Sequence, residues 1–271
     1  MKHRERPKWS CRDSKRGPLV VFVILRALIV ICMFRQLYRG NYQDVLLCII
    51  SLLVIAVPSM LHSTLKIVMP NALEIAIALF VFAAEILGEI SNFYWYFPFW
   101  DTMLHTINGF LAAAIGFSVV DLLNTHIKGL QMAPLFVALV SFCFSMTVGT
   151  MWEFFEFSGD QLAGLDMQKD RIVQKIASVE LDPAHDNNAV QIRGIARTVL
   201  YDSSGKELIT IEGGYLDIGI IDTMKDLACN MVGAVVFSVF GCLYIRRRDK
   251  YTLAAHFLVV QEEEQQPSSE T

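Results

Sequence analysis

The sequence predicts an all-α transmembrane bundle of about six helices, with a small β-rich extracytoplasmic insert between the fifth and sixth helices. Three observations predict it. Hydrophobic residues make up 54% of the chain and charged residues only 18%, and the mean hydropathy is +0.44. A soluble core of 271 residues could not bury so many apolar side chains. Six apolar runs approach the length that spans a bilayer, and a long polar stretch precedes the last of them.

The six apolar runs supply the expected helices in chain order. Each is close to the roughly 20 residues that a helix needs to cross the hydrocarbon. They cover residues 19–34, 45–61, 72–90, 102–120, 133–152 and 227–245. The first run follows a basic region, as a signal peptide does, but it lacks a small-x-small cleavage site, so we expect a retained anchor.

Basic residues at the two ends of the chain predict the orientation. Cytoplasmic flanks of membrane helices carry an excess of Lys and Arg, so both termini should lie in the cytoplasm. Arg35 and Arg39 would then lie outside, against the rule. The basic residues that decide the assignment are Lys2, Arg4, Arg6, Lys8, Arg12, Lys15, Arg16, Arg246, Arg247, Arg248 and Lys250, with Lys66 and Lys128 in inner loops.

The chain therefore divides into five expected regions. These are a basic cytoplasmic arm (1–18), transmembrane helices 1–5 (19–160), the extracytoplasmic β-rich insert (161–221), transmembrane helix 6 (222–246) and a cytoplasmic tail (247–271). The net charge of −4, with the basic residues gathered at the termini, argues against a nucleic-acid partner. The bilayer is the expected partner of the helices, and the insert could bind a protein or an envelope component.

Alternating β-branched residues predict strands within the insert. They occur over 171–181, 189–201 and 207–212, and the turn sequence Asp202-Ser203-Ser204-Gly205 lies between the last two. This pattern is typical of a hairpin. We expect three strands packed over the outer mouth of the bundle.

Acidic residues and a histidine gather where the apolar runs end. With six spans, all of these ends lie on one side of the membrane, whichever way the protein is inserted. Ionisable groups near the hydrocarbon boundary are costly, so their convergence predicts a functional site. The residues are Glu85, Glu89, Asp101, His105, Glu153, Glu156, Asp160, Asp222 and Asp226.

Spacing divides these residues into pairs that share a helix face. Asp101 and His105 are four residues apart, Glu153 and Glu156 three, and Asp222 and Asp226 four. Small residues at helix-packing spacing predict that the fourth, fifth and sixth spans form the core. These residues are Gly109, Ala112, Ala113, Gly116, Ser141, Ser145, Gly149, Ala234 and Ser238.

Carboxylates and an imidazole suit a divalent cation, so a divalent metal is the candidate cofactor. The predicted ligands are Asp101, His105, Glu153, Glu156, Asp222 and Asp226, supported by Glu85, Glu89, Asp160, Asn230 and Arg26. Without a metal, neighbouring carboxylates would share protons. The absence of charged residues from the inner halves of spans four to six argues against a continuous proton relay.

Structural interpretations of the same residues remain open. Acids at helix starts favour the helix dipole whatever the function, and Lys225 could pair with an acid in an ion network. Arg26 lies mid-span, where an isolated guanidinium is expensive, and Glu85 is its candidate partner. Arg26 could alternatively bind an anion.

The cysteines carry no expected chemistry. Cys32, Cys48, Cys143, Cys229 and Cys242 lie in apolar runs, and none forms a C-x-x-C pair. This pattern indicates neither a disulfide framework nor a thiolate metal site, so we expect small buried hydrophobes.

Three motifs resemble those of a known family. They are Trp100-Asp101-x-x-x-His105-x-x-x-Gly109, then Trp152-Glu153-x-x-Glu156, then Asp222-x-x-Lys225-Asp226 leading into Asn230-x-x-Gly233-Ala234. Together, over about residues 70–245, they resemble the YjdF-like family of bacterial inner-membrane proteins and, more loosely, the VanZ-like membrane proteins. The resemblance implies a multi-pass protein of the bacterial cytoplasmic membrane and names no reaction. The long insert before Asp222 departs from the family pattern.

Three function classes follow. The first is a membrane protein whose outward-facing site binds a divalent cation or protons. The second is a metal-assisted enzyme acting on a lipid-linked or envelope substrate at the outer leaflet, although no P-loop, G-x-S-x-G or H-E-x-x-H motif is present. The third is a structural or sensory module. The sequence leaves open whether the protein is an enzyme.

Overall fold

A computed structural model describes residues 16–65, 67–127, 132–247, 254–258, 260 and 261. The basic residues before Arg16, the inner-loop residues Lys66 and Lys128, and most of the tail lie outside the described residues. The chain forms two compact units. One contains residues 1–149 and 229–271, and the other contains residues 150–228.

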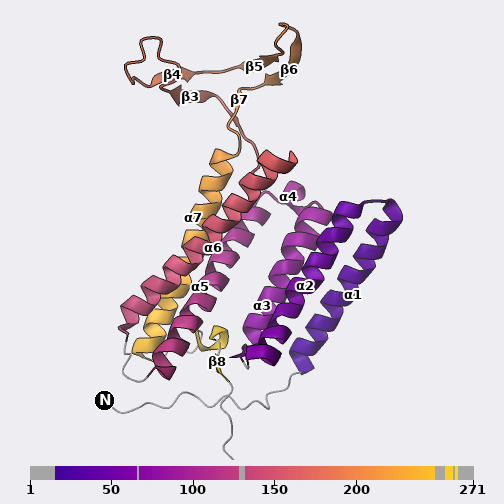
Figure 1. Ribbon diagram of the computed structural model, residues 1–271, viewed down its shortest axis with the longest axis vertical. Helices are drawn as coiled ribbons and strands as arrows, with labels where there is room; N and C mark the ends of the chain where they lie inside the picture. The colour runs from indigo at the N-terminus through magenta and orange to yellow at the C-terminus, as the bar shows by residue number, and fades with distance from the viewer. Residues whose placement is uncertain (1–15, 66, 128–131, 248–253, 259, 262–271) are drawn as a thin grey trace, which may run out of the picture. The chain divides into compact units, whose positions relative to one another are not determined.

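The first unit begins with a helical hairpin. Helices α1 (Arg16–Arg39) and α2 (Tyr42–Leu65) are joined at Gly40, whose φ of +75° suits glycine, and they run side by side in Figure 1. The short α3 (Asn71–Val81) continues directly into a π-helix, η1 (Phe82–Ile90). Leu25, Ile29 and Cys48 form an apolar core with residues of these segments.

The rest of the first unit is built on α5. After α4 (Phe93–Tyr96), helix α5 runs from Trp100 to His126, α6 from Pro134 to Ala163 and α7 from Ile220 to Arg246. Their buried core includes Phe117, Val137 and Phe237. The prediction that the fourth, fifth and sixth apolar runs supply a common core is therefore confirmed. A 3₁₀ turn, η2 (Ala254–Phe257), and the paired strands β1 (Ile67–Val68) and β8 (Val260–Gln261) complete the unit.

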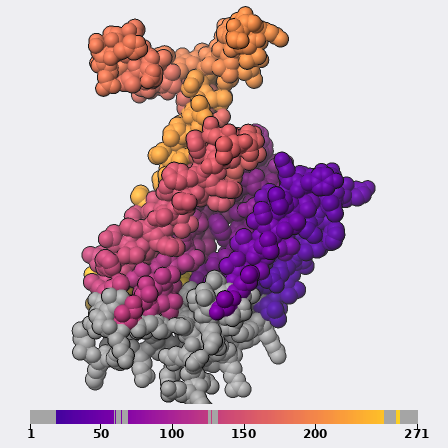
Figure 2. All heavy atoms as spheres, viewed as in Figure 1, coloured from indigo at the N-terminus to yellow at the C-terminus, as the bar shows by residue number. Residues whose placement is uncertain are grey.

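Four of the described helices are long and apolar enough to cross a membrane. They cover Leu19–Arg39, Trp100–Asn124, Pro134–Ala163 and Ile220–Arg246, and α2 has a shorter apolar segment, Tyr42–Pro58. Helical segments also cover the third expected span (72–90), which is divided between α3 and η1. The indigo face in Figure 2 belongs to α1 and α2, where large side chains such as Val23, Ile31 and Phe34 are exposed. An apolar surface of this kind suits contact with lipid. The prediction that the protein is mostly helical is confirmed.

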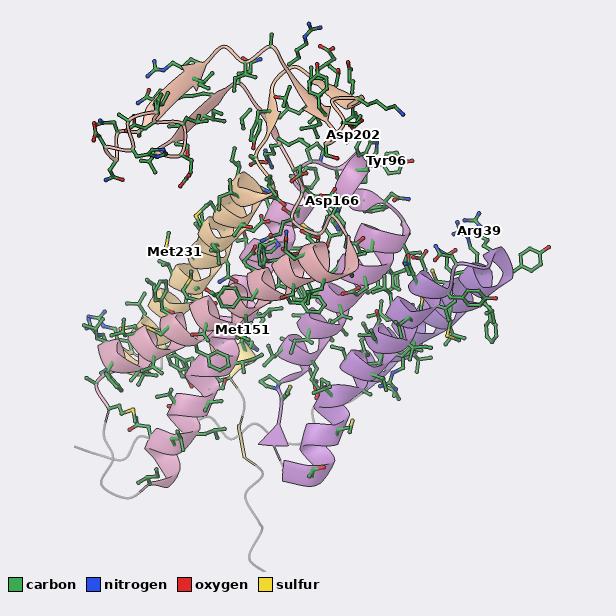
Figure 3. All side chains as sticks on the ribbon, turned by 45° about the horizontal axis from the view of Figure 1, so that its top comes forward. Arg39, Tyr96, Met151, Asp166, Asp202 and Met231 are labelled. Atoms are coloured by element: carbon green, nitrogen blue, oxygen red, sulfur yellow. The ribbon has the colours of Figure 1, made fainter. Side chains whose placement is uncertain are left out.

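Aromatic residues surround the start of α5. Trp95 and Tyr96 are exposed, and Tyr96 points away from its helix in Figure 3. Phe93 packs edge-on against Trp100 with ring centroids 4.9 Å apart. The indole N–H of Trp100 donates a hydrogen bond to the carbonyl oxygen of Ala83 (3.2 Å), so the first turn of α5 is attached to η1.

The second unit contains the ends of α6 and α7 and three antiparallel strand pairs. Strand β2 (Ile172–Val173) pairs with β7 (Tyr215–Leu216), β3 (Lys175–Ser178) with β4 (Val190–Arg193), and β5 (Arg197–Tyr201) with β6 (Glu207–Glu212). The β5–β6 hairpin is confirmed at its predicted turn.

The expectation of three strands was wrong. The stretch 189–201 is interrupted at Gly194, which has a φ of +71°, and the two halves pair with different partners. A non-glycine residue would be strained in that conformation, so the break follows from the glycine.

Candidate functional site

The site begins in the first turn of α5. Nε2 of His105 lies 3.4 Å from a carboxylate oxygen of Asp101, one turn earlier on the same helix. The His105 side chain is 12% exposed and that of Asp101 27% exposed. The predicted shared face is therefore observed, and it is partly shielded from solvent.

Close backbone contact fixes α7 against α5. A side chain at Gly233 would overlap the carbonyl oxygen of Thr106, and one at Gly109 would overlap the carbonyl oxygen of Asn230. Glycine is required at both positions because no Cβ fits there. The glycines seen in the sequence motifs thus set the approach of the two helices.

Asn230 joins three helices at the same level. Its side-chain oxygen accepts a hydrogen bond from Nδ2 of Asn108 (3.1 Å), and its Nδ2 donates to the carbonyl oxygen of Ser145 (3.3 Å). Asn230 is fully buried. Ser145 donates in turn to the carbonyl oxygen of Gly109 (2.8 Å). A buried amide whose groups are bonded fixes the rotation of α7 about its axis.

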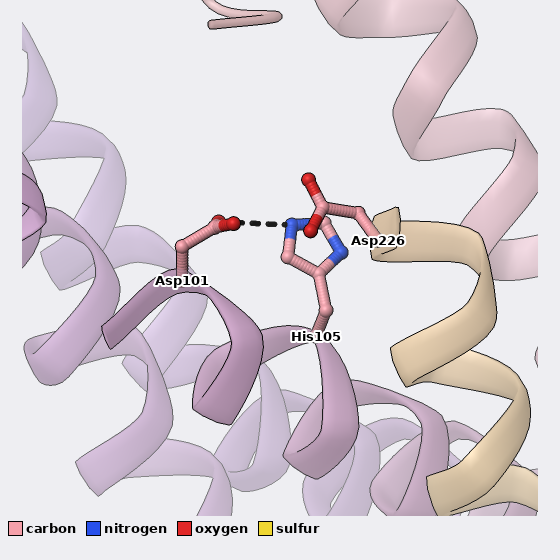
Figure 4. A group of neighbouring side chains, drawn as sticks. All are labelled: Asp101, His105 and Asp226. Atoms are coloured by element: carbon pink, nitrogen blue, oxygen red, sulfur yellow. Dashed lines mark ion pairs between the residues drawn. The ribbon is translucent and has the colours of Figure 1, made fainter. Parts of the chain in front are cut away.

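One turn before these contacts, α5 and α7 supply a group of potential metal ligands. His105 precedes Gly109 by four residues, and Asp226 precedes Asn230 by four. One ligand atom from each of Asp101, His105 and Asp226 lies within 4.8 Å of the others. Figure 4 shows the His105 ring and the Asp226 carboxylate facing each other from these two helices. Asp226 is only 2% exposed.

Lys225 neutralises acids at the start of α7. Its ammonium nitrogen lies 3.2 Å from Asp226 and 3.5 Å from Asp222. Asp222 also lies 3.5 Å from the guanidinium of Arg171 and accepts a hydrogen bond from the backbone N–H of Lys169 (3.1 Å). Asp222 therefore joins the insert to α7, and its ion pair with Lys225 is the one that the structural interpretation expected.

Other predicted site residues have structural contacts of their own. Asp160 accepts hydrogen bonds from the backbone N–H groups of Met167 (2.6 Å) and Gln168 (2.9 Å), which closes the turn after α6. Glu156 accepts a hydrogen bond from the indole of Trp152 (2.8 Å). Glu153 is 4% exposed. The Asp101, His105 and Asp226 group contains three of the six predicted ligands, and the other three are Glu153, Glu156 and Asp222.

The supporting residues Glu85 and Glu89 lie in the π-helix η1, with Glu89 exposed. Arg26 lies on α1 with its side chain exposed and its guanidinium carbon 5.8 Å from the centre of the Phe22 ring. That ring contact is on its own helix. Among the described residues, no ion pair joins Arg26 to Glu85.

Two polar residues of α5, the half-buried Asn108 and the buried Asp121, were missed by sequence reasoning. Asn108 contacts Asn230, and its position three residues after His105 could have indicated this. Asp121 is 6% exposed and lies inside α5, because the helix extends beyond the predicted span to His126. The expectation that the inner half of this span lacks charged residues was therefore wrong, and that argument against a proton relay no longer holds.

Comparison with known proteins agrees with this architecture. Residues 18–247 match the family model described as "Predicted membrane protein (DUF2238)". The chain belongs to this family. The match is consistent with the YjdF-like resemblance, and the looser VanZ-like resemblance gains no support from it. No curated protein and no solved structure matches the chain. This member of the DUF2238 family is therefore a membrane protein whose Asp101, His105 and Asp226 group could hold a metal.

Proposed function

We propose that this DUF2238 protein binds a divalent cation through Asp101, His105 and Asp226. The convergence of one nitrogen and two carboxylate oxygens within 4.8 Å is the observation that carries the proposal. Imidazole and carboxylate together suit borderline cations such as Zn²⁺, Mn²⁺ or Fe²⁺. A cation there would offset the cost of keeping two carboxylates beside an imidazole in a partly buried position.

Lys225 is the resident counter-ion of Asp222 and Asp226. Because its ammonium contacts Asp226, a metal would share that carboxylate with Lys225 or displace it. This contact also supports the alternative function, an ion network that only stabilises the start of α7. The two functions differ in one respect: only the first predicts saturable binding of an added divalent cation.

Three protein donors leave a coordination position for water or substrate, as in catalytic zinc sites. This donor number supports metal-assisted chemistry as an extension of the proposal. The substrate expected from the sequence is lipid-linked or an envelope component.

Binding is tested with tag-free protein in mild detergent. Added Zn²⁺ or Mn²⁺ should raise the unfolding temperature of the wild type and titrate to one site. His105→Gln and Asp226→Asn should abolish that titration. Glu156→Gln is the matched control, because this carboxylate is bonded to Trp152 and lies outside the group, so its titration should persist. Equal responses in all four proteins would refute the site.

We also propose that the site faces the extracytoplasmic side, with both termini in the cytoplasm and about six spans. The basic residues at the two ends of the chain support this orientation. A membrane-impermeant maleimide applied to intact cells tests it. Ser203→Cys in the β5–β6 turn should be labelled, and Thr125→Cys at the opposite end of α5 should not. Labelling of Thr125→Cys alone would reverse the orientation.

A further inference from the structure

The α1–α2 hairpin pairs residues that are equally distant from Gly40. Gln36 and Asp44 lie four residues before and after it, and the Gln36 side-chain amide donates a hydrogen bond to the Asp44 carboxylate. The next such pair, one helical turn further from Gly40, is Cys32 and Cys48. Cys48 lies in the buried core of the hairpin, Cys32 packs against that core, and the two thiols lie close enough to interact. Two cysteines that are sixteen residues apart in the sequence are thus neighbours.

The cysteine pair lies inside the packed interface of the hairpin. Cys48 is fully buried in the core formed with Leu25, Ile29 and Ile55, and Cys32 packs against the same core. Cys32 is only partly buried, so one sulfur of the pair can be reached from the surrounding bilayer and the other cannot. A partly buried thiol beside a fully buried one has the arrangement of an attacking and a resolving cysteine.

The sequence expectation for these two residues was incomplete. They are small residues in an apolar core, as expected, but the antiparallel hairpin supplies a pairing that no C-x-x-C motif encodes. Helix geometry explains this: positions a whole number of turns from the same connecting turn recur on the facing sides of both helices.

We propose that Cys32 and Cys48 form a redox-active dithiol, which closes to an intramolecular disulfide when a quinone dissolved in the bilayer accepts its electrons. The S–H bonds of both residues break and one S–S bond forms. The two electrons and two protons pass to the quinone, whose two carbonyl oxygens become the hydroxyls of the hydroquinone.

The location of the pair selects this class of oxidant. Cys32 and Cys48 are each eight residues from Gly40, which places them about 12 Å along their helices from the turn. Water-soluble oxidants reach that depth poorly, whereas quinones partition into the hydrocarbon. Thiols that are already neighbours need only the approach of two sulfur atoms to the roughly 2.05 Å of a disulfide. This inference goes beyond the proposed cation site and does not depend on it.

The test uses the full chain, reduced and reconstituted into liposomes, with a short-chain quinone added under argon. The protein is then unfolded, its thiols are alkylated, and the intact mass counts them. Each chain has six cysteines. We expect four alkylated thiols after quinone treatment, one hydroquinone formed per chain, and a peptide that links Cys32 to Cys48.

Cys32→Ser and Cys48→Ser should each abolish hydroquinone formation. Both variants are made, so that a folding defect in one of them leaves the other to test the proposal. Cys143→Ser is the matched control, because Cys143 is exposed on α6 and should leave oxidation of the pair unchanged. Six alkylated thiols in quinone-treated wild type, or a linkage between other cysteines or between chains, would overturn the proposal.

Discussion

Nδ2 of Asn108 lies 3.1 Å from Oδ1 of Asn230, and this partly buried hydrogen bond joins α5 to α7 one turn beyond His105 and Asp226. The site depends on that junction because its ligands come from both helices. The hydrogen bond fixes their rotation, and the glycine contacts fix their separation. Substitutions can therefore disturb the rotation and the separation of the two helices without changing a metal-binding residue.

Asn230→Ala should destabilise the protein and weaken cation binding. The substitution removes the hydrogen bonds to Asn108 and to the carbonyl oxygen of Ser145. Interhelical hydrogen bonds in membrane proteins contribute about 0.6–1.7 kcal/mol each. Thermal unfolding in detergent measures the loss. Thr147→Ala is the control, since this exposed residue donates to a carbonyl oxygen of its own helix. Equal stability of the two variants would contradict the role of Asn230.

Gly109→Ala should force α5 and α7 apart. The added methyl group would overlap the carbonyl oxygen of Asn230, which is backbone and cannot move without moving α7. We expect a destabilisation of about 1–3 kcal/mol, typical of overpacking, together with lost cation binding. The comparison is with Val236→Ala, a change of an exposed residue on α7. If Gly109→Ala bound the cation as tightly as Val236→Ala, the helix approach would not control the site.

Lys225→Gln should strengthen cation binding about tenfold, which corresponds to about 1.4 kcal/mol. Removing the ammonium beside Asp226 and Asp222 leaves their negative charge uncompensated, so a divalent cation gains attraction. The affinity is measured by calorimetric titration at low ionic strength. Lys206→Gln, in the exposed β5–β6 turn, should change the affinity little. Weaker binding in Lys225→Gln would favour the purely structural ion network.

The β5–β6 hairpin should lose stability in acid. Hydrogen bonds from the Ser204 hydroxyl (2.6 Å) and the backbone N–H of Lys206 (2.9 Å) hold the pKa of Asp202, labelled in Figure 3, below its usual range. Because the folded pKa is depressed, the stabilisation is complete above the unfolded value near 3.8 and disappears as pH falls through the folded value. Hydrogen exchange of the hairpin amides measures this loss of stability.

Asp202→Asn provides the control for that titration. An amide has no carboxylate to protonate, so the pH dependence of exchange below about pH 4 should become shallower in this variant. An unchanged pH profile in Asp202→Asn would assign the acid sensitivity to another group.

Sequence patterns predicted where helices form better than they predicted which side chains of different helices contact one another. Apolar runs indicated where helices form because burial in lipid requires only length and hydrophobicity. The spacing of Asp101 and His105 also predicted a shared face, because both lie on one helix. By contrast, the proximity of Cys32 and Cys48 depends on the register of a hairpin, which no local spacing shows.

The composition of the site shows the same limit. Counting helix ends gathered eight acids and one histidine at one side, but it could not separate Asp226 from Asp160, which closes a local turn. That distinction depends on the direction of each side chain and on nearby backbone donors. Gly194 similarly divided one alternating run into two strands, since a single left-handed residue redirects the chain.

Elemental mass spectrometry of tag-free protein tests the cation site most directly. The account predicts close to one divalent metal per chain in the wild type and in Glu156→Gln, and none in folded His105→Gln or Asp226→Asn. Wild-type protein that contains no metal and takes up none from added Zn²⁺, Mn²⁺ or Fe²⁺ would contradict it. Asp101, His105 and Asp226 would then form a structural ion network.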